Sequence, residues 1–410
     1  MKAIGIISEY NPYHTGHAYL LRKAREITGA SHAVSVMSGC FSQQGSPMVL
    51  DKYLRAAAAA SDGLDLVFEL PVLYATGSAR DFAEGAVLLL TRLGLVDTLC
   101  FGVEDPDPDS FERITCCILE EPAAYRDVLL ERQKAGDSYP AAREEALAAV
   151  LGDDVRPVLR QPNNILALEY HLAIRRLGSP LKICMIRRSS DYHSGSTASA
   201  TAIRNHLTAL EASGETGSAG SYLREALPEG AAGLLEPEAA HFLLSSDGLT
   251  PYLAARMMEL SDLPEESELP LDMTAELYQR LRKVSLPSDY ESIVNDLKRR
   301  NETRGRITRS LLHLMLGIRE KDRVRPAEIQ SPYLNLLAAR SESTHLLRKV
   351  QEAGELIVIT KKSAYIPADP VTDRLWSLDR KAASLYAQLV HDAFGITLPP
   401  ELKRTPVILD

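Results

Sequence analysis

The 410-residue chain has no apolar run that reaches the roughly 18 residues a membrane-spanning helix needs. Residues 1–5 lead directly into an apolar, strand-like segment, so we expect no signal peptide. Cysteine is scarce and CxxC spacing is missing; the five cysteines are Cys40, Cys100, Cys116, Cys117 and Cys184. These absences argue against a membrane protein, a disulfide scaffold and a structural zinc site. We therefore expect a cytoplasmic protein without a resident metal site.

Positive charge is also in deficit, since the formal net charge is −9. This charge argues against indiscriminate binding to nucleic acid. It leaves room for a local basic surface, because a phosphate backbone responds to charges within about one Debye length. Hydrophobic residues make up 45% and charged residues 25% of the chain, which is the balance of a globular protein, and the length indicates two domains.

Strand-like and helical segments alternate in the first half of the chain. We expect strands at residues 3–8, 32–37, 64–70, 98–103 and 181–186. We expect helices at residues 18–27, 51–61, 79–93 and 164–177, irregular helix over 110–151, a polar loop at 189–199 and a helix that opens near Thr201. This alternation indicates βαβ units, so the sequence predicts an α/β, Rossmann-like domain with a parallel sheet over residues 1–210.

The second half has mainly helical periodicity. Residues 211–221 have the Gly- and Ser-rich composition of a loop or linker. Beyond them we expect helices at 238–245, 251–260, 274–284, 288–298, 307–318 and 381–394, and a short β-like pair at 356–366. The sequence therefore predicts a mainly α-helical domain, with a short β element, over residues 211–410.

The segment after the first strand carries His14, Gly16 and His17 and then enters a helix. The two histidines are three positions apart, so they share one face of a helical turn. Gly16 lets a ligand approach the backbone, and the free N–H groups at a helix start favour anions. At the carboxyl end of a parallel strand, this pattern predicts a phosphate site. The alternatives are an HxxH sequence without function and a pair of metal-binding histidines.

A second candidate element, Ser199–Arg204, follows the last strand of the first half and opens a helix. The hydroxyls of Ser199 and Thr201, the helix-start N–H groups and Arg204 suit the outer phosphates of a nucleotide. The alternative is an ordinary helix N-cap followed by a solvated arginine. Together the two elements predict one active site for adenylyl transfer, because the sequence offers neither hydride-transfer machinery nor a hydrolytic triad.

These two elements resemble the HxGH motif and the late ISSTxIR-like motif of the nucleotidylyltransferase superfamily. A closer resemblance is to the tRNA(Met) cytidine acetate ligase family, whose hallmarks run through the chain in order and thin after about residue 205. The matching segments are Gly5–His14, Val36–Gly39, Asp51–Ala56, Glu69–Pro71, Phe101–Glu104, Gln161–Ala167, Ile186–Arg188 and Tyr192–His193.

The resemblance implies a nucleotidylyltransferase-like, ATP-binding catalytic domain and an ATP-dependent ligase. Such an enzyme forms acetyl-adenylate from acetate and transfers the acetyl group to N4 of the wobble cytidine of elongator tRNA(Met), giving N4-acetylcytidine. ATP is then a substrate, and Mg²⁺ is expected with its phosphates. The alternatives are a small-molecule adenylyltransferase, a protein-directed acetate ligase, and a noncatalytic nucleotide- or RNA-binding module. The intact histidines and Arg204 argue against the last of these.

The resemblance also implies roles for single residues. It assigns catalysis to His14, His17, Lys52 and Arg204. It assigns ATP binding to Ile7, Ser8, Glu9, Tyr10, Asn11, Pro12, Tyr13, His14, Thr15, Gly16, His17, Ala18, Tyr19, Leu20, Gly102, Asn163, Asn164, Arg187, Arg188, Ser199 and Thr201.

Some of these residues have structural alternatives. Gly102 can be a strand-end turn, Asn163 a helix N-cap, and Arg187–Arg188 a solvated strand end. The carboxylates Glu69 and Glu104 also follow predicted strands, and we expect them to be structural rather than catalytic.

The chain departs from the family in one loop, residues 37–47, where relatives read like MSGNFVQRGEP. Here Cys40 stands in place of an asparagine and Gln44 in place of an arginine. If this loop shapes the acetate pocket, the change affects acyl choice or rate. We expect no covalent role for Cys40, because the sequence offers no partner base nearby.

Basic residues concentrate at 298–325, which holds ten basic and three acidic residues, a net +7. A focused basic patch on an acidic protein can dock phosphates and still resist nonspecific RNA. We therefore predict that Arg299, Arg300, Arg304 and Arg306 bind tRNA, and that Arg340, Arg348, Lys349, Lys361 and Lys362 extend the patch. The alternative is a solvated helix laced with salt bridges.

Overall fold

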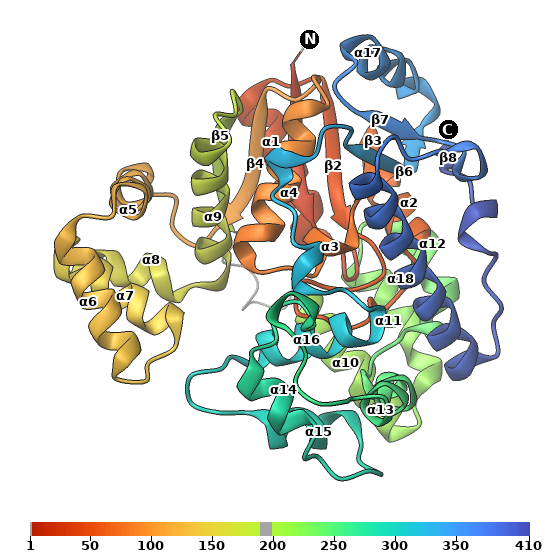
Figure 1. Ribbon diagram of the computed structural model, residues 1–410. Coiled ribbons are helices and arrows are strands. Elements are labelled where there is room, and N and C mark those ends of the chain that lie inside the picture. Colours follow the sequence, from red (N-terminus) through yellow and green to blue (C-terminus); the bar gives the residue numbers. More distant parts are fainter. Residues whose placement is uncertain (1, 189–198) are drawn as a thin grey trace.

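A computed structural model describes residues 2–188 and 199–410 (Figure 1). Its strands form one sheet in the order β5-β4-β1-β2-β3-β6-β7, with β8 beside β6. The strands are β1 Ala3–Ser8, β2 His32–Ser38, β3 Leu66–Leu70, β4 Thr98–Val103, β5 Lys182–Arg187, β6 Tyr333–Arg340, β7 Ile357–Ile359 and β8 Val407–Leu409. Residues 189–198 of the predicted polar loop, with the family-like Tyr192 and His193, lie outside the described residues.

The five strands predicted for the first half are present and parallel. Their apolar sequences suit a parallel sheet because its two faces are both buried. Ile4 and Ile6 of β1 pack into one core, and Val34 and Val36 of β2 into the other. The strand order reverses between β1 and β4, and open α/β sheets bind ligands beyond the carboxyl ends of the strands at such a point. The predicted Rossmann-like α/β fold is therefore confirmed.

Helices cover both faces of this sheet (Figure 1). On one face lie α1 (Thr15–Thr28) and α2 (Lys52–Ser61). On the other, α4 (Ala79–Arg92) and α9 (Pro162–Arg176) pack on each other and on the sheet. Alanines at 56–60 of α2 are all buried, because small side chains let this helix approach β6 and its neighbours closely.

The second half of the chain adds strands to the same sheet, which the sequence did not predict. β6 pairs antiparallel with β3, and β7 and β8 pair parallel with β6. β6 is buried along seven of its eight residues, and its Leu- and Ala-rich sequence lacks the β-branched residues typical of strands and favours a helix instead. Of the predicted pair at 356–366 only β7 is a strand, and a 3₁₀ turn, Lys362–Ala364, follows it. The domain boundary at residue 210 stays a prediction, and the sheet continues across it.

The linker predicted at 211–221 is mostly helical, and this prediction is wrong. α10 (Ala200–Ser213) ends at Gly214, whose positive φ of 75° forms a left-handed C-cap, and α11 (Ala219–Ala226) starts soon after. Leu223 is fully buried, so tertiary packing overrides a loop-like composition. The helix predicted at 238–245 is a 3₁₀ helix, Glu236–His241, followed by extended chain.

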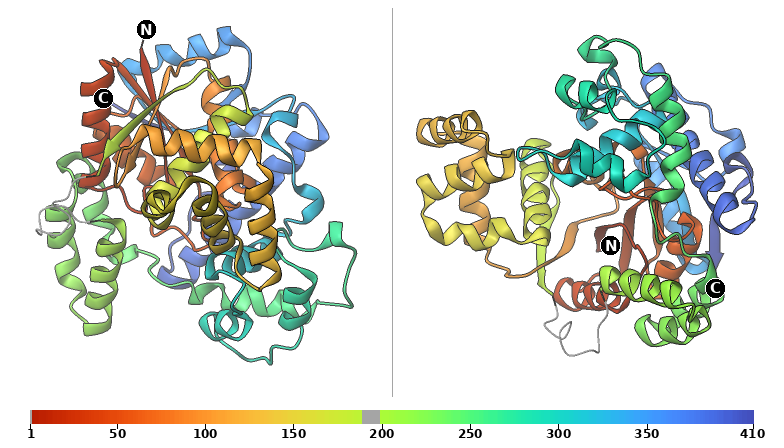
Figure 2. Two further views of the ribbon diagram at one scale, coloured as in Figure 1. Left: turned by 90° about the vertical axis from the view of Figure 1, so that its left-hand side faces the viewer. Right: turned by 90° about the horizontal axis from the view of Figure 1, so that it is seen from below.

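Most of the other helices surround the carboxyl ends of the strands, as the view from below shows (Figure 2), whereas α17 lies near the amino ends of the parallel strands (Figure 1). They are α3 Val72–Ala75, α5 Pro108–Glu120, α6 Ala123–Lys134, α7 Tyr139–Leu151, α8 Arg156–Arg160, α12 Glu229–Leu235, α13 Thr250–Met258, α14 Ala275–Leu281, α15 Tyr290–Leu297, α16 Arg304–Leu316, α17 His345–Ala353 and α18 Pro370–Phe394. Across residues 2–188 and 199–410, every helix is too short or too polar to cross a bilayer.

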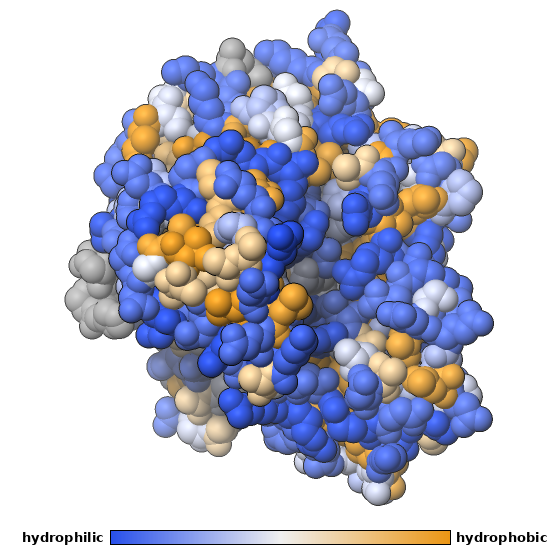
Figure 3. All heavy atoms as spheres, turned by 60° about the vertical axis from the view of Figure 1, so that its left-hand side comes forward, coloured by the Kyte–Doolittle hydropathy of each residue, from blue (hydrophilic) through white to orange (hydrophobic). Residues whose placement is uncertain are grey.

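The lobe formed by α5–α8 stands beside the sheet. It contains the helices predicted over 110–151 and exposes a few large apolar side chains, including Leu119 and Leu130. Figure 3, in which the side of the molecule bearing this lobe comes forward, shows a largely hydrophilic face with local hydrophobic groups.

Candidate active site

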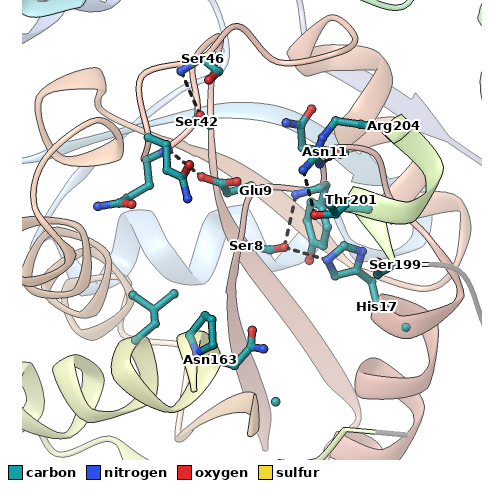
Figure 4. A pocket seen from close by; sticks show the side chains of 18 of the residues that line it. Ser8, Glu9, Asn11, His17, Ser42, Ser46, Asn163, Ser199, Thr201 and Arg204 are labelled. Carbon is teal, nitrogen blue, oxygen red and sulfur yellow. Dashed lines mark hydrogen bonds between the residues drawn. The ribbon is translucent and has the colours of Figure 1, made fainter. Parts of the chain in front are cut away.

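A cavity of about 1130 Å³ opens at the carboxyl ends of β1, β4 and β5. Its walls come from the β1–α1 turn, the loop at 42–47, and the starts of α9, α10 and α16. Figure 4 shows Ser8, His17, Thr201 and Arg204 close together on one side, with Ser42 and Ser46 on another. The cavity therefore collects side chains from both halves of the chain.

Backbone groups hold both histidines in one tautomer. His14 is the N-cap of α1, and its Nδ1 accepts a hydrogen bond from the Gly16 N–H at 3.0 Å. The Nδ1 of His17 accepts from the His14 N–H at 3.3 Å. Each neutral imidazole therefore carries its proton on Nε2, and the Nε2 of His17 lies 3.4 Å from Ser8 Oγ. The turn thus presents two N–H donors beside a helix start, as a phosphate site requires.

Both imidazoles are neutral at physiological pH. Burial, together with the charges of Arg188 and Arg204, lowers the pKa of His14 to about 3. Burial, together with His14 and Arg188, holds the pKa of His17 well below its usual value. The ring centroids are only 4.0 Å apart, so a second positive charge would be repelled. The negative charge of a bound triphosphate would oppose the repulsion by the neighbouring positive charges, and it would raise the pKa of both histidines.

Arg204 joins the two predicted elements. It donates from Nη1 to the Asn11 carbonyl at 2.6 Å and from Nη2 to Thr201 Oγ1 at 3.1 Å. Ser199 is the N-cap of α10, and its hydroxyl accepts from the Ala202 N–H at 3.2 Å. The N-cap alternative for Ser199 is thus correct, whereas Arg204 is half-buried and bound rather than solvated. The structure brings both elements to one cavity.

Gly102, Arg187 and Arg188 lie at the ends of β4 and β5 and line the same cavity. A Cβ at position 102 would lie 3.2 Å from Cγ of Arg188, so glycine keeps this part of the wall open. Arg187 is exposed and pairs with Asp105 at 2.7 Å, which resembles the solvated strand end considered for it.

The two asparagines take different places. Asn163 lines the cavity, and its amide donates to Glu104 Oε1 at 2.5 Å. The N-cap of α9 is Gln161, so the capping alternative for Asn163 is wrong. Asn164 is buried away from the cavity wall and accepts from the Glu104 N–H at 3.1 Å. Glu104 thus orders the start of α9, in keeping with the structural role expected for it.

Most residues predicted to bind ATP line the cavity, although ATP contact by any of them stays a prediction. Those away from its wall are Pro12, Tyr13, Thr15, Ala18 and Asn164. Tyr13 supports the site from behind, since its ring stacks on His17 with centroids 5.4 Å apart and its hydroxyl donates to Asp62 at 2.6 Å.

Lys52 lies outside this cavity. Its buried ammonium pairs with Glu69 at 2.7 Å and with Glu401 at 3.0 Å. Burial opposes the charge, but the two carboxylates hold the pKa of Lys52 well above its usual value. Lys52 and Cys40 line a separate cavity of about 70 Å³, and burial raises the pKa of the Cys40 thiol. This placement favours structural roles for Lys52 and Glu69, so catalysis by Lys52 stays a prediction without geometric support.

The loop that departs from the family forms part of the cavity wall. The Gln43 N–H donates to Glu9 Oε1 at 2.6 Å, and the Gln44 carbonyl accepts from Thr308 Oγ1 at 2.6 Å. Burial raises the pKa of Glu9, and the Gln43 N–H and Arg204 limit the rise. Within the described part of the cavity wall, Glu9 carries the only carboxylate. The loop therefore links the carboxylate of Glu9, directly after β1, to α16 in the second half of the chain.

Helix α16 brings part of the basic segment to the same cavity. Arg304 lines the cavity and pairs with Glu291 at 2.5 Å. Arg306 is half-buried and donates to the Asp272 carbonyl at 2.9 Å. These two arginines already have protein partners, and Arg304 lines the same cavity as His14 and His17 of the β1–α1 turn.

Arg299 and Arg300 precede α16 and are exposed. Arg299 donates to the carbonyls of Asp296 and Lys298, and Arg300 lies 3.3 Å from Asp137. They are more available to a ligand than Arg304 and Arg306, and RNA binding by all four stays a prediction.

Sequence reasoning missed much of the apolar wall. It includes Phe82, Phe101, Leu166, Tyr170, Leu243 and Leu244. Such residues carry no local signal, because an apolar side chain that lines a cavity follows the same pattern as one inside the core.

Comparison with known proteins identifies the family. The HIGH Nucleotidyl Transferase family model matches residues 1–396. A tRNA(Met) cytidine acetate ligase of Acetivibrio thermocellus is 33% identical over 398 residues, which cover 94% of each chain. The chain belongs to the tRNA(Met) cytidine acetate ligase family of HIGH nucleotidyl transferases. The resemblance read from the sequence motifs is thereby confirmed.

Other relatives agree over the full length. A tRNA(Met) cytidine acetate ligase of Caldicellulosiruptor saccharolyticus is 32% identical over 100% of this chain and 99% of its own. The crystal structure of Thermotoga maritima TmcAL bound with alpha-thio ATP has a TM-score of 0.86 and 28% identity, and the match covers 100% of both chains. The match extends well beyond residue 205, where the motif resemblance thins.

Proposed function

We propose that this chain is an ATP-dependent ligase that forms acetyl-adenylate and transfers the acetyl group to N4 of the wobble cytidine of elongator tRNA(Met). The observation that carries the proposal is the convergence of His14, His17 and Arg204 on one cavity, in a chain of this family. Acetate and tRNA(Met) come from the names of the relatives, and ATP also from the alpha-thio ATP bound by the T. maritima protein.

The first step needs positioning and charge stabilisation rather than a covalent intermediate on the protein. An acetate oxygen attacks the α-phosphorus of ATP, the bond to the β-phosphate oxygen breaks, and pyrophosphate leaves. The Nε2–H groups of His14 and His17 and the guanidinium of Arg204 would stabilise the charge on the phosphates, because they are fixed before ATP arrives.

Magnesium would be held mainly by ATP itself. Glu9 is the only carboxylate on the described wall of the cavity, and no cluster of three His, Cys, Asp or Glu side chains fit for a metal occurs within residues 2–188 and 199–410. Mg²⁺ commonly keeps several waters and binds through substrate phosphates, so this sparse donor set fits an ion that arrives with the nucleotide.

In the second step, N4 of cytidine attacks the acyl carbon, the bond to the adenylate oxygen breaks and AMP leaves. N4 must also lose a proton. Glu9 lies on the wall between the loop at 42–47 and the β1–α1 turn that carries His14 and His17, which we call the nucleotide turn. Its raised pKa brings it closer to the range of an effective base. We assign Glu9 as the acceptor of this proton.

The proposal is tested by following pyrophosphate release with acetate, in the presence and absence of tRNA(Met). An acetate ligase that acts on this tRNA releases pyrophosphate from ATP when acetate is present, even without tRNA. When tRNA is added, it converts the wobble cytidine to N4-acetylcytidine. A protein-directed acetate ligase would release pyrophosphate with acetate without modifying the tRNA, and a small-molecule adenylyltransferase would release it only when its own acceptor is supplied. A noncatalytic module would do neither.

A further inference from the structure

A second cavity, of about 460 Å³, lies where α16 packs against α13 and α18. Three basic residues reach it, Arg256 from α13 and Arg380 and Lys381 from α18, together with Ser377 and Ser384. It is separate from the cavity at the carboxyl ends of β1, β4 and β5, which we call the nucleotide cavity, and none of the predicted site residues lines it. All the charged side chains that line this cavity are thus cationic.

The cations of this cavity are incompletely neutralised. Arg256 pairs with Glu259 at 2.7 Å, but neither Arg380 nor Lys381 pairs with a carboxylate of the described chain. The Nε of Arg380 is buried and has no hydrogen-bond partner there. A buried donor without a partner is costly to a fold, so Arg380 keeps an unused donor for a ligand of this cavity.

Lys381 and Arg256 converge at the end of α16. A Cβ at Gly317 would lie 3.9 Å from Nζ of Lys381 and 4.0 Å from Nη2 of Arg256. Burial lowers the pKa of Lys381, and the charges of Arg374 and Arg256 lower it further. Arg374 is itself bound to Asp322 at 2.6 Å. Positive charge therefore gathers around Lys381 beyond what nearby acids offset.

Much of the basic segment at 298–325 shows the opposite pattern. Glu268 pairs with both Arg319 and Lys321, and Arg323 pairs with three carboxylates, of which Asp81 and Asp272 lie elsewhere in the chain. A phosphate that approached these side chains would have to displace carboxylates. At Arg380 and Lys381 it would meet donors with no such partner.

Helix α16 connects the two cavities. Arg304 at its start lines the nucleotide cavity, and Leu316 at its end lines the cationic cavity. Twelve steps of 1.5 Å place these residues about 18 Å apart along the helix. An RNA whose target nucleotide enters the first cavity can therefore bring a backbone phosphate to the second.

We propose that the cavity formed by Arg256, Arg380 and Lys381 binds a backbone phosphate of the RNA substrate. This inference rests on the proposed function, because the RNA is the ligand that both cavities would share. The phosphate would accept from the Arg380 guanidinium and the Lys381 ammonium, while the serine hydroxyls offer further donors.

The test compares Arg380→Gln/Lys381→Gln with Arg319→Gln/Lys321→Gln, a control that loses the same charge from an ion-paired site. We expect the first variant to bind tRNA(Met) at least tenfold more weakly at 0.1 M salt, on the order expected for one or two lost phosphate contacts. Its slope of log affinity against log salt should fall by about 1–2, while the control changes by less than about twofold. Acetate-dependent ATP–pyrophosphate exchange without tRNA should be unchanged, which also shows that the variant folds.

Two further measurements distinguish an RNA phosphate from a free anion and from a purely structural role of the cations. Arg380→Lys/Lys381→Arg keeps both charges and should restore most of the affinity. Calorimetric titration with inorganic phosphate alone detects a site for a free anion. Phosphate binding that depends on Arg380 and Lys381, with unchanged tRNA affinity, would overturn the proposal. So would a lower melting temperature with the parental salt slope, because the cations would then only offset the C-terminal dipole of α16. If the parent modifies no tRNA, the proposed function fails instead.

Discussion

The nucleotide turn and the basic segment at 298–325 both carry groups suited to phosphate, but they differ in what those groups contact. In the turn, His14 and His17 are neutral and oriented by backbone N–H groups, and Arg204 binds backbone and a hydroxyl. In the segment, arginines such as Arg304 and Arg323 pair with carboxylates. Fixed donors without an acidic partner suit a phosphate, whereas a high count of charges does not by itself make a phosphate site.

The largest expected effect concerns His17. His17→Ala removes a fixed Nε2–H donor and should lower acetate-dependent ATP–pyrophosphate exchange by about a hundredfold or more. His206→Ala is the matched control, because His206 is exposed and stacks on Tyr222 away from the cavity. The melting temperature of each variant should stay within a few degrees of the parent. Exchange by His17→Ala at the parental rate would show that the turn does not serve the triphosphate.

A different step should fail when Glu9 is replaced. Glu9→Gln keeps the acceptor for the Gln43 N–H but cannot take a proton from N4. We expect acetyl transfer to the tRNA to slow by about a hundredfold, with pyrophosphate exchange reduced only slightly. Single-turnover transfer from preformed acetyl-adenylate, measured against pH, gives the comparison. Equal losses in both half-reactions would instead place Glu9 with the ATP or its magnesium.

The neutral state of His14 predicts acid sensitivity. Its folded pKa of about 3 lies below the unfolded value of about 6.5, so the unfolded chain binds the proton in between. The stability is complete above pH 6.5 and is lost as the pH falls. We expect about 2 kcal/mol of the unfolding free energy to vanish between pH 7 and pH 5 through His14 alone. Thermal melts of His14→Gln, which cannot titrate, should show a correspondingly weaker pH dependence, and an unchanged dependence would contradict the neutral imidazole.

The smallest effect is expected in the basic segment. Arg299→Gln/Arg300→Gln should weaken tRNA binding by only a few-fold, because one arginine already donates to carbonyls and the other lies near Asp137. Arg304→Gln/Arg306→Gln should mainly lower the melting temperature, since both arginines tie α16 to its neighbours. Filter binding over a salt series gives affinities and slopes. If either double variant bound tRNA tenfold or more weakly than the parent, the basic segment would be the main surface that binds tRNA.

Local patterns were enough for the parallel sheet and for the nucleotide turn. Apolar runs that alternate with helices predicted β1–β5, and HxGH after the first strand predicted the turn that brings His14 and His17 to the cavity. They failed for β6, because its Leu- and Ala-rich sequence has none of the β-branched residues typical of strands, and for α11, because loop-like residues became helical through packing. Each of those elements depends on partners far away in the sequence.

Residue types and their order along the chain therefore determined the α/β fold, the family and the presence of the histidines and Arg204 at the carboxyl ends of the strands. Only the tertiary structure decided that Lys52 faces Glu69 and Glu401 rather than the nucleotide cavity, that Glu9 meets the loop at 42–47, and that the basic segment is largely neutralised. The reason is physical. Chemistry and local conformation are properties of a short segment, but pairing and burial of charge depend on which distant side chains the fold brings within a few ångströms.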